Sequence, residues 1–136
     1  MHRLLDVDPA AASPIWRQIE DGMRRLVASG RLGSGIPVPS VRELAKSLRV
    51  NPATVSKAYR QLTEGGLLEV RRGEGTYVVG LSPEALGALR RGLLAGSAAA
   101  FVREAGAVGA DREEALRAVE DSWQHDGEGG RGGLDG

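Results

Sequence analysis

The 136-residue sequence predicts a mainly α-helical chain with one small β-hairpin. Apolar residues recur at helical spacing over about residues 14–29, 40–47 and 51–65, so we expect three amphipathic helices there. Two short β-prone runs, 67–72 and 76–79, flank a glycine-rich turn, which is the pattern of a hairpin. The order helix, helix, turn, helix, hairpin predicts a winged helix-turn-helix domain, in which the hairpin is the wing.

Capping residues define where the second and third of these helices begin. Ser40 is followed three residues later by Glu43, which together predict a capping box. Asn51 and Pro52 combine a capping side chain with a proline suited to the first helical position. The two helices are therefore predicted to be separated by a tight turn.

The chain divides into three predicted parts. Residues 1–80 form the winged helix-turn-helix domain, and residues 81–124 form a short two-helix dimerisation region with helices at about 83–105 and 112–124. Residues 125–136 contain six glycines and almost no apolar residues, so we expect a disordered tail.

The two helices after the hairpin carry large apolar residues in addition to those that form the predicted core of the first domain. These residues are the predicted dimer contacts: Leu86, Leu89, Leu93, Leu94 and Phe101 on the first helix, and Leu116, Val119 and Trp123 on the second.

Composition limits the compartment and the class of partner. The chain has no cysteine, so it can form neither a disulfide nor a thiolate metal site. No uninterrupted apolar run approaches the ~20 residues of a membrane span, and the N-terminus lacks the apolar core of a signal peptide. We therefore expect a cytoplasmic protein without a membrane partner. Net charge is zero, but residues 1–80 carry +4 and residues 81–136 carry −4, which predicts two surfaces with different partners.

Candidate enzymatic motifs are absent. Gly73, Glu74 and Gly75 lack the third glycine and the following helix of a dinucleotide-binding loop. The two histidines, His2 and His125, lie near opposite ends of the chain. The sequence therefore predicts neither an enzyme nor a bound metal or cofactor.

Positive charge concentrates on the predicted helix-turn-helix and wing. Between Ser40 and Arg72 the chain has three glutamates and seven cations: Arg42, Lys46, Arg49, Lys57, Arg60, Arg71 and Arg72. DNA requires cations for phosphates and small polar side chains for base edges. The helix starts at Ser40 and Asn51 also offer backbone N–H groups that suit phosphate oxygens. These features predict binding to double-stranded DNA.

The order and spacing of many residues resemble the DNA-binding domain of GntR-family transcriptional regulators. The resemblance covers about residues 14–79, and it rests on Gln18-Ile19, Gly30-Arg31-Leu32, Pro39-Ser40-Val41-Arg42-Glu43-Leu44-Ala45, Leu48-Arg49-Val50-Asn51, Thr54-Val55, Ala58-Tyr59 and Gly73-Glu74-Gly75-Thr76-Tyr77-Val78. The short region behind the hairpin is similar to that of the YtrA subfamily, whose members have two dimerisation helices in place of a large effector-binding domain.

This resemblance implies roles for particular residues. Arg42 should contact phosphate or a base edge. The groove-facing start of the recognition helix should present Asn51, Thr54, Ser56 and Lys57, and the wing tip near the minor groove should present Gly73, Glu74, Gly75 and Thr76. The full predicted DNA-binding set is Ser40, Arg42, Arg49, Asn51, Thr54, Ser56, Lys57, Arg60, Arg72, Gly73, Gly75 and Thr76. Pro52 and Ser56 stand where many members have arginine, so the operators of those members should not transfer to this chain.

Two functional hypotheses follow. The first is a homodimeric transcriptional regulator, expected to be a repressor, that binds an inverted-repeat operator. The second is a protein-interaction module on a winged-helix scaffold, because fold alone does not determine function. Neither the target genes nor a small-molecule effector can be inferred from the sequence.

Overall fold

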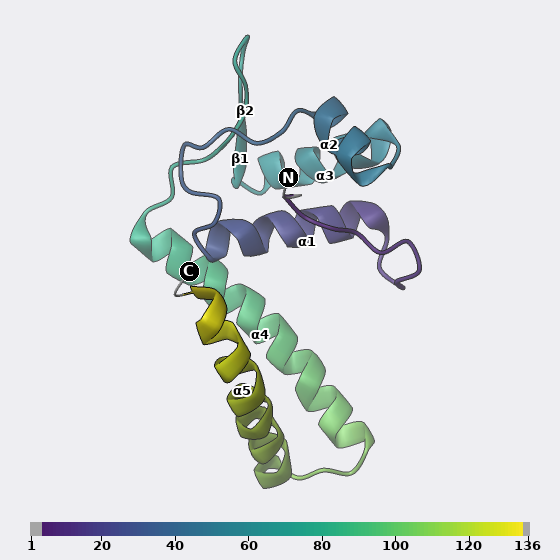
Figure 1. Ribbon diagram of the computed structural model, residues 1–136, viewed down its shortest axis with the longest axis vertical. Coiled ribbons are helices and arrows are strands. Elements are labelled where there is room, and N and C mark those ends of the chain that lie inside the picture. The colour runs from purple at the N-terminus through teal and green to yellow at the C-terminus, as the bar shows by residue number, and fades with distance from the viewer. Residues whose placement is uncertain (1–3, 135–136) are drawn as a thin grey trace. The chain divides into compact units, whose positions relative to one another are not determined.

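The computed structural model describes residues 4–134, and describes side chains for residues 4–126. Within this range the predicted fold class is confirmed: three helices, an antiparallel hairpin and two further helices follow one another (Figure 1). The elements are α1 (Ile15–Ala28), α2 (Val41–Leu48), α3 (Pro52–Glu64), β1 (Leu68–Arg71), β2 (Gly75–Val78), α4 (Pro83–Ala107) and α5 (Arg112–Leu134).

The chain forms two compact units, an N-terminal unit (Met1–Leu93) and a C-terminal unit (Leu94–Gly136). In the N-terminal unit, α3 packs against α1, α2 and β1 and so lies at the centre of the core. The largest fully buried side chains come from all three helices and both strands: Ile19, Met23, Val27, Leu44, Val55, Leu62, Leu68 and Val78. The predicted apolar faces of the helices therefore meet in one core, as their helical spacing requires.

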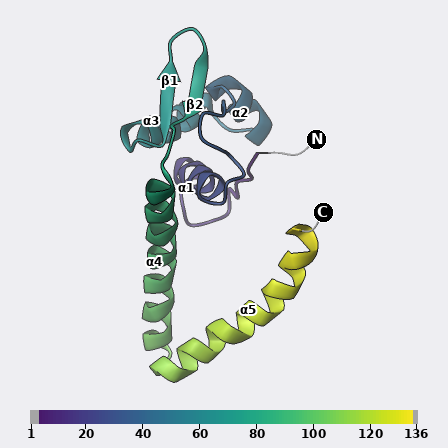
Figure 2. The ribbon, with the colours of Figure 1, turned by 90° about the vertical axis from the view of Figure 1, so that its left-hand side faces the viewer.

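The wing is the β1–β2 hairpin, which projects away from the three helices (Figure 2). Leu68 pairs with Val78 at the base of the hairpin, and Arg71 pairs with Gly75 near its tip. The segment between α1 and α2, which the sequence predicted as a plain loop, adds to the edge of β2. Val38 N–H donates to the Thr76 carbonyl at 2.9 Å, and an isolated bridge joins Pro37 to Tyr77. These hydrogen bonds attach the base of the wing to the chain that enters α2.

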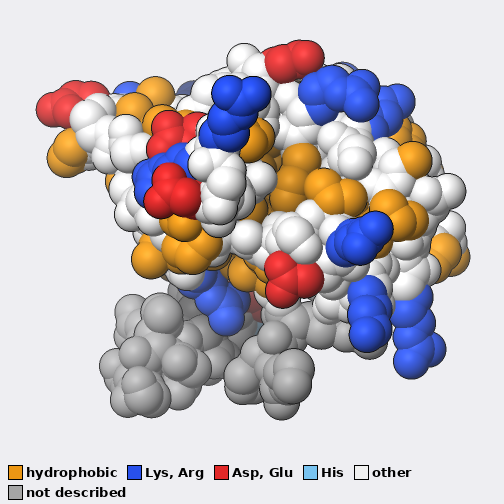
Figure 3. Space-filling model, turned by 90° about the horizontal axis from the view of Figure 1, so that it is seen from above, with side chains coloured by type: hydrophobic (Ala, Val, Ile, Leu, Met, Phe, Trp, Pro, Cys, Tyr) orange, Lys and Arg blue, Asp and Glu red, His pale blue; other side chains and the backbone are white. Residues whose placement is uncertain are grey.

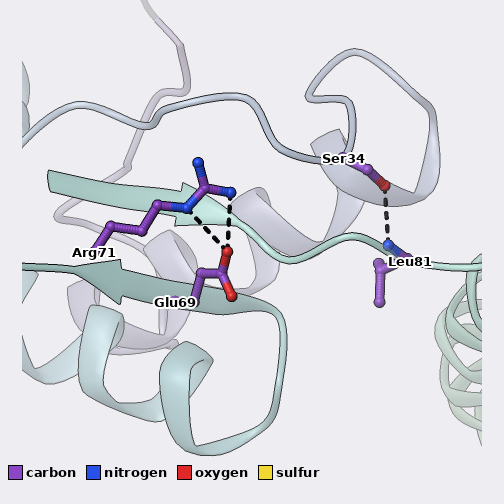
Figure 4. A network of polar contacts seen from close by, with 4 residues as sticks. All are labelled: Ser34, Glu69, Arg71 and Leu81. Carbon is purple, nitrogen blue, oxygen red and sulfur yellow. Dashed lines mark hydrogen bonds and ion pairs between the residues drawn. The ribbon is translucent and has the colours of Figure 1, made fainter. Parts of the chain in front are cut away.

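The boundary between the units lies inside α4, after Leu93, whereas the sequence predicted the end of the domain at residue 80. Leu86 and Leu89 pack against the N-terminal core. The start of this connection is also fixed, because Leu81 N–H donates to the Ser34 hydroxyl at 3.0 Å (Figure 4). The first turns of α4 therefore add to the core of the N-terminal unit, and Leu86 and Leu89, which the sequence predicted as dimer contacts, contribute to that packing.

The turn between α4 and α5 is built around Gly109. Its φ of +77° is left-handed, and the next N–H, that of Ala110, donates to the Ala105 carbonyl at 2.8 Å. This is the hydrogen bond that closes a Schellman C-cap. Asp111 then starts α5, because its carboxylate accepts from Glu114 N–H at 2.9 Å. Both ends agree with the predicted break in the sequence.

The helix α5 continues to Leu134, about ten residues beyond its predicted end. The prediction that the segment from residue 125 is disordered is therefore wrong over residues 125–134, and residues 135–136 lie outside the described range. Glycine lowers helix propensity but does not remove a backbone hydrogen bond as proline does. No proline follows Pro83, so an established helix can continue through this segment.

By length and composition, α4 also qualifies as a candidate membrane span. Its most apolar stretch has a mean hydropathy of 1.2, and none of that stretch is buried. The same composition is expected of a helix in a soluble protein when another apolar surface covers it. The length and the composition of α4 are thus shared by both kinds of helix.

Candidate nucleic-acid interface

The helix-turn-helix begins at the capping box that the sequence predicted. Glu43 N–H donates to the Ser40 hydroxyl oxygen at 3.1 Å, and Ser40 N–H donates to the Glu43 carboxylate at 3.0 Å. The backbone hydrogen bond from Ser40, followed by its side-chain contact, lowers the pKa of Glu43 below its ordinary value. The carboxylate is therefore ionised at neutral pH and helps to fix the start of α2.

The start of α3 is capped in a different way. Asn51 Oδ1 accepts from Ala53 N–H at 2.9 Å, Thr54 N–H donates to the Asn51 carbonyl at 2.9 Å, and Pro52 has no N–H to offer. The expectation of free backbone donors for phosphate at this helix start is therefore wrong. Ser40 and Asn51 both act as capping residues, and at the start of α3 side chains must supply the contacts to an anion.

Tyr59 fixes the recognition helix α3 to the segment that leads into α2. Its ring is 5% exposed, and its hydroxyl donates to the Pro39 carbonyl at 2.7 Å. Burial, and secondarily the negative charge of Glu43, raises the pKa of Tyr59 well above its ordinary value. Tyr59 is thus a neutral core residue, as the sequence predicted.

The turn between α2 and α3 contains an unusual backbone conformation. Arg49 has φ 58° and ψ 49°, in the left-handed region, and it is the one non-glycine residue with positive φ in the described chain. A side chain in this region costs roughly 1–2 kcal/mol relative to the right-handed conformation. The chain nevertheless has an exposed arginine at this position, where a glycine could adopt the left-handed conformation without strain.

Exposed cations lie on α2, on the turn and on α3. On the right-hand side of Figure 3, where α2 and α3 lie, Lys and Arg side chains predominate over Asp and Glu. The exposed cations of this region and of the hairpin turn are Arg42, Lys46, Arg49, Lys57, Arg60 and Arg72. Among the residues that the structure describes, none of these six forms an ion pair with a carboxylate.

Two cations contact aromatic rings, and one of them, Lys57, is among these six. The Arg71 guanidinium lies 4.0 Å from the centroid of the Tyr77 ring and pairs with Glu69 at 3.0 Å (Figure 4). Lys57 Nζ lies 4.4 Å from the centroid of the Trp16 ring. The Lys57–Trp16 contact joins residues far apart in the sequence, so no local pattern predicted it. Arg71 stiffens the wing, whereas Lys57 on α3 is held against Trp16 on α1.

A hollow of about 390 Å³ separates α3 from the wing. Its lining combines hydroxyl groups, one cation, one carboxylate and apolar side chains: Val41, Ser56, Tyr59, Arg60, Thr63, Glu64, Val70 and Thr76. Val70 is 69% exposed although it is apolar. Sequence analysis did not identify Val70.

The tip of the wing depends on two glycines. Gly73 has φ 78° and Gly75 has φ 122°, conformations that side chains rarely adopt. Nothing lies near the position of a Cβ at either residue. Backbone conformation therefore explains both glycines in the free protein, and Thr76 follows them on β2 facing the hollow.

Among the residues that the structure describes, no three His, Asp or Glu side chains lie close enough together to hold a metal ion. The arrangement is instead a capped helix, a cationic turn and a rigid hairpin, which can bind a polyanion of defined shape.

Comparisons with known proteins agree with this geometry. Residues 16–78 match the family described as "Bacterial regulatory proteins, gntR family". The chain is 44% identical over 75 residues to the HTH-type transcriptional repressor YtrA of Bacillus subtilis, a match that covers 55% of this chain and 58% of that protein. It is 32% identical over 113 residues to the HTH-type transcriptional regulator Rv1152 of Mycobacterium tuberculosis, covering 83% of this chain and 88% of that protein.

Solved structures show the same relationship. A GntR family transcriptional regulator from Listeria monocytogenes has a TM-score of 0.75 at 28% identity, over 85% of this chain and 98% of that chain. The AraR DNA-binding domain in complex with operator ORX1 has a TM-score of 0.52 at 25% identity, over 58% of this chain and 100% of that chain. The chain therefore belongs to the GntR family of bacterial transcriptional regulators, and its winged helix-turn-helix is of the YtrA-like type.

Proposed function

We propose that the chain is a homodimeric repressor that binds an inverted-repeat operator in the bacterial cytoplasm. The observation that carries the proposal is the set of exposed cations without carboxylate partners on α2, the turn, α3 and the hairpin turn. Unpaired cations on a capped helix-turn-helix are suited to phosphates on both sides of a major groove.

In this proposal α3 enters the major groove with its N-terminal end towards the bases. Thr54 and Ser56, both partly exposed, can donate or accept at base edges. Arg42 and Arg49 bind phosphates beside the groove, while Ser40 and Asn51 contribute by starting the helices at the DNA surface. With Pro52 and Ser56 in place of arginines, base recognition depends on small polar contacts.

The wing then lies at the adjacent minor groove, so one DNA strand must pass between the wing and α3. The hollow there matches a sugar–phosphate backbone in chemistry. Arg60 and the hydroxyls of Ser56 and Thr76 suit phosphate oxygens, and the exposed side chain of Val70 suits a deoxyribose. Arg72 lies beside Gly73 at the tip of the wing, where a further phosphate contact is expected.

The C-terminal unit supplies the dimer contacts in this proposal. Large apolar side chains remain exposed on both of its helices and on the turn between them: Leu94, Phe101, Val102, Val108, Leu116, Val119 and Trp123. On α5, Leu116, Val119 and Trp123 recur at helical spacing and form one stripe. A second copy offers the same stripe, and a two-fold dimer presents two identical α3 helices. The expected operator is therefore an inverted repeat.

Selection from a random pool of DNA duplexes tests the proposal. The full chain should enrich an inverted repeat, and its affinity should fall steeply as salt is added. Arg42→Ala should weaken binding about tenfold and make the salt dependence shallower. The matched control is Arg25→Ala, which removes an exposed arginine from the C-terminal turn of α1 and should bind as the wild type does. A pool without any enriched sequence would favour the protein-interaction hypothesis.

A further inference from the structure

The contact between Trp16 and Lys57 joins the first turn of α1 to the outer face of α3. Lys57 Nζ lies 4.4 Å from the Trp16 ring centroid, well within the ~6 Å range of a cation–π interaction. Trp16 is partly buried and packs against the N-terminal core, whereas Lys57 is exposed. The indole is thus a fixed surface, and the lysine is the mobile partner that it holds.

Holding Lys57 has a consequence for binding an anion. A lysine on a helix surface samples many rotamers, and it loses that freedom when its ammonium group binds a phosphate. The indole covers one side of the ammonium group and leaves N–H donors directed towards solvent. Part of the ordering that a phosphate contact requires is therefore already present in the free protein.

The position of Lys57 makes this ordering relevant to DNA. On a helical projection of α3, Lys57 lies almost opposite the buried residues Val55, Ala58 and Leu62. Thr54 and Gln61 share the side of α3 on which Lys57 lies, whereas Ser56 lies on the side of the hollow. A cation held at this place can bind the phosphate strand on the side of the groove away from the wing.

We propose that Trp16 is a positioning residue for DNA recognition. Trp16 orders Lys57 before the lysine binds a phosphate, and it remains in contact with Lys57 in the complex. This inference rests on the proposed function. It gives Trp16 a role beyond its packing in the core, and it explains how a lysine rather than an arginine can contribute in a recognition helix that has few cations.

A double-mutant cycle with a duplex recovered from the random pool tests the inference. Trp16→Leu should lower affinity about two- to fivefold, and Trp16→Phe should lower it less, because phenylalanine retains a weaker cation–π surface. Lys57→Met should lower affinity and reduce the salt dependence. The Trp16→Leu/Lys57→Met double variant should bind no more weakly than Lys57→Met alone. Ile36→Ala, which truncates an apolar side chain that is 46% exposed in the same unit, is the matched control.

Fluorescence distinguishes failure of the inference from failure of the proposed function. In a Trp123→Phe background Trp16 is the only tryptophan, and Lys57→Met should shift its emission in the free protein. Losses of affinity that multiply in the double variant, tighter binding by Trp16→Leu, or unchanged emission would each overturn the role of Trp16. A pool without an enriched sequence, together with a shifted emission, would instead overturn the proposed function and leave the contact itself established.

Discussion

The two units of this chain bury their apolar residues to very different extents. In the N-terminal unit, side chains such as Met23, Leu62 and Val78 are 0% exposed. In the C-terminal unit, Ala105 is the one buried side chain among those described, and Trp123 is 75% exposed. The first unit completes its own core, whereas the second has long helices that share little packing with each other.

This difference indicates which unit can be stable by itself and which unit requires a second surface. The N-terminal unit has the buried surface that a small domain needs to fold by itself. The C-terminal unit has helical periodicity and caps but no core, so its apolar surface needs a second surface to cover it. Its order should therefore depend on protein concentration, as expected where association and folding are linked.

The largest expected effect follows from breaking the proposed contact in the C-terminal unit. Leu116→Asp/Val119→Asp places two charges in the α5 stripe and should convert the dimer to a monomer. Loss of bivalent binding should weaken affinity for an inverted repeat by about 10²–10⁴-fold, whereas the N-terminal unit stays folded. Light scattering coupled to size-exclusion chromatography and fluorescence anisotropy measure the two effects. The neighbouring exposed pair Arg117→Gln/Glu120→Gln is the control, and an unchanged mass for the aspartate variant would refute the proposed dimer contact.

A smaller effect is expected from truncating leucines in the two units. Leu62→Ala removes a side chain that is 0% exposed and should lower the free energy of unfolding of the N-terminal unit by about 3 kcal/mol. Leu116→Ala, at a residue that is 50% exposed, should leave that free energy nearly unchanged. Urea unfolding followed by circular dichroism compares the two. If the two variants lost the same free energy of unfolding, the two units would not differ in the way that the exposed fractions of Leu62 and Leu116 indicate.

Local sequence patterns predicted the helices, their caps and the wing. Ser40 and Asn51 cap the helices that they were expected to cap, because a capping hydrogen bond spans only two or three residues. The same patterns assigned Leu86 and Leu89 to the dimer region. Apolar spacing identifies the face of a helix but not the surface that covers it.

Two features that the sequence did not predict depend on contacts between distant segments. The Lys57–Trp16 contact and the pairing of residue 37 with residue 77 join parts of the chain that no local pattern connects. The length of α5 was underestimated because glycine content was taken as a helix end. Propensity is a weak predictor once a helix has been nucleated.

The smallest effect is expected at Arg49, where the stable unit retains a strained residue. Arg49→Gly should relieve the left-handed strain at φ 58°. Glycine also gains freedom in the unfolded chain, so the free energy of unfolding should stay the same or rise by up to about 1 kcal/mol. Affinity for the selected duplex should fall about threefold to tenfold because a phosphate contact is lost.

Arg49→Gly is informative because it is expected to lower affinity without lowering stability. Replacing a residue that serves the structure alone would lower both stability and affinity, or neither. Replacing a residue that is retained for binding lowers affinity without lowering stability. Arg49→Asn is the matched control, since asparagine tolerates the left-handed region but has no charge, and it should bind as weakly as the glycine variant. Arg49→Lys should retain most of the affinity. An affinity unchanged by all three substitutions would mean that the strain at this turn serves no contact with DNA, and that the charge on the N-terminal unit acts elsewhere.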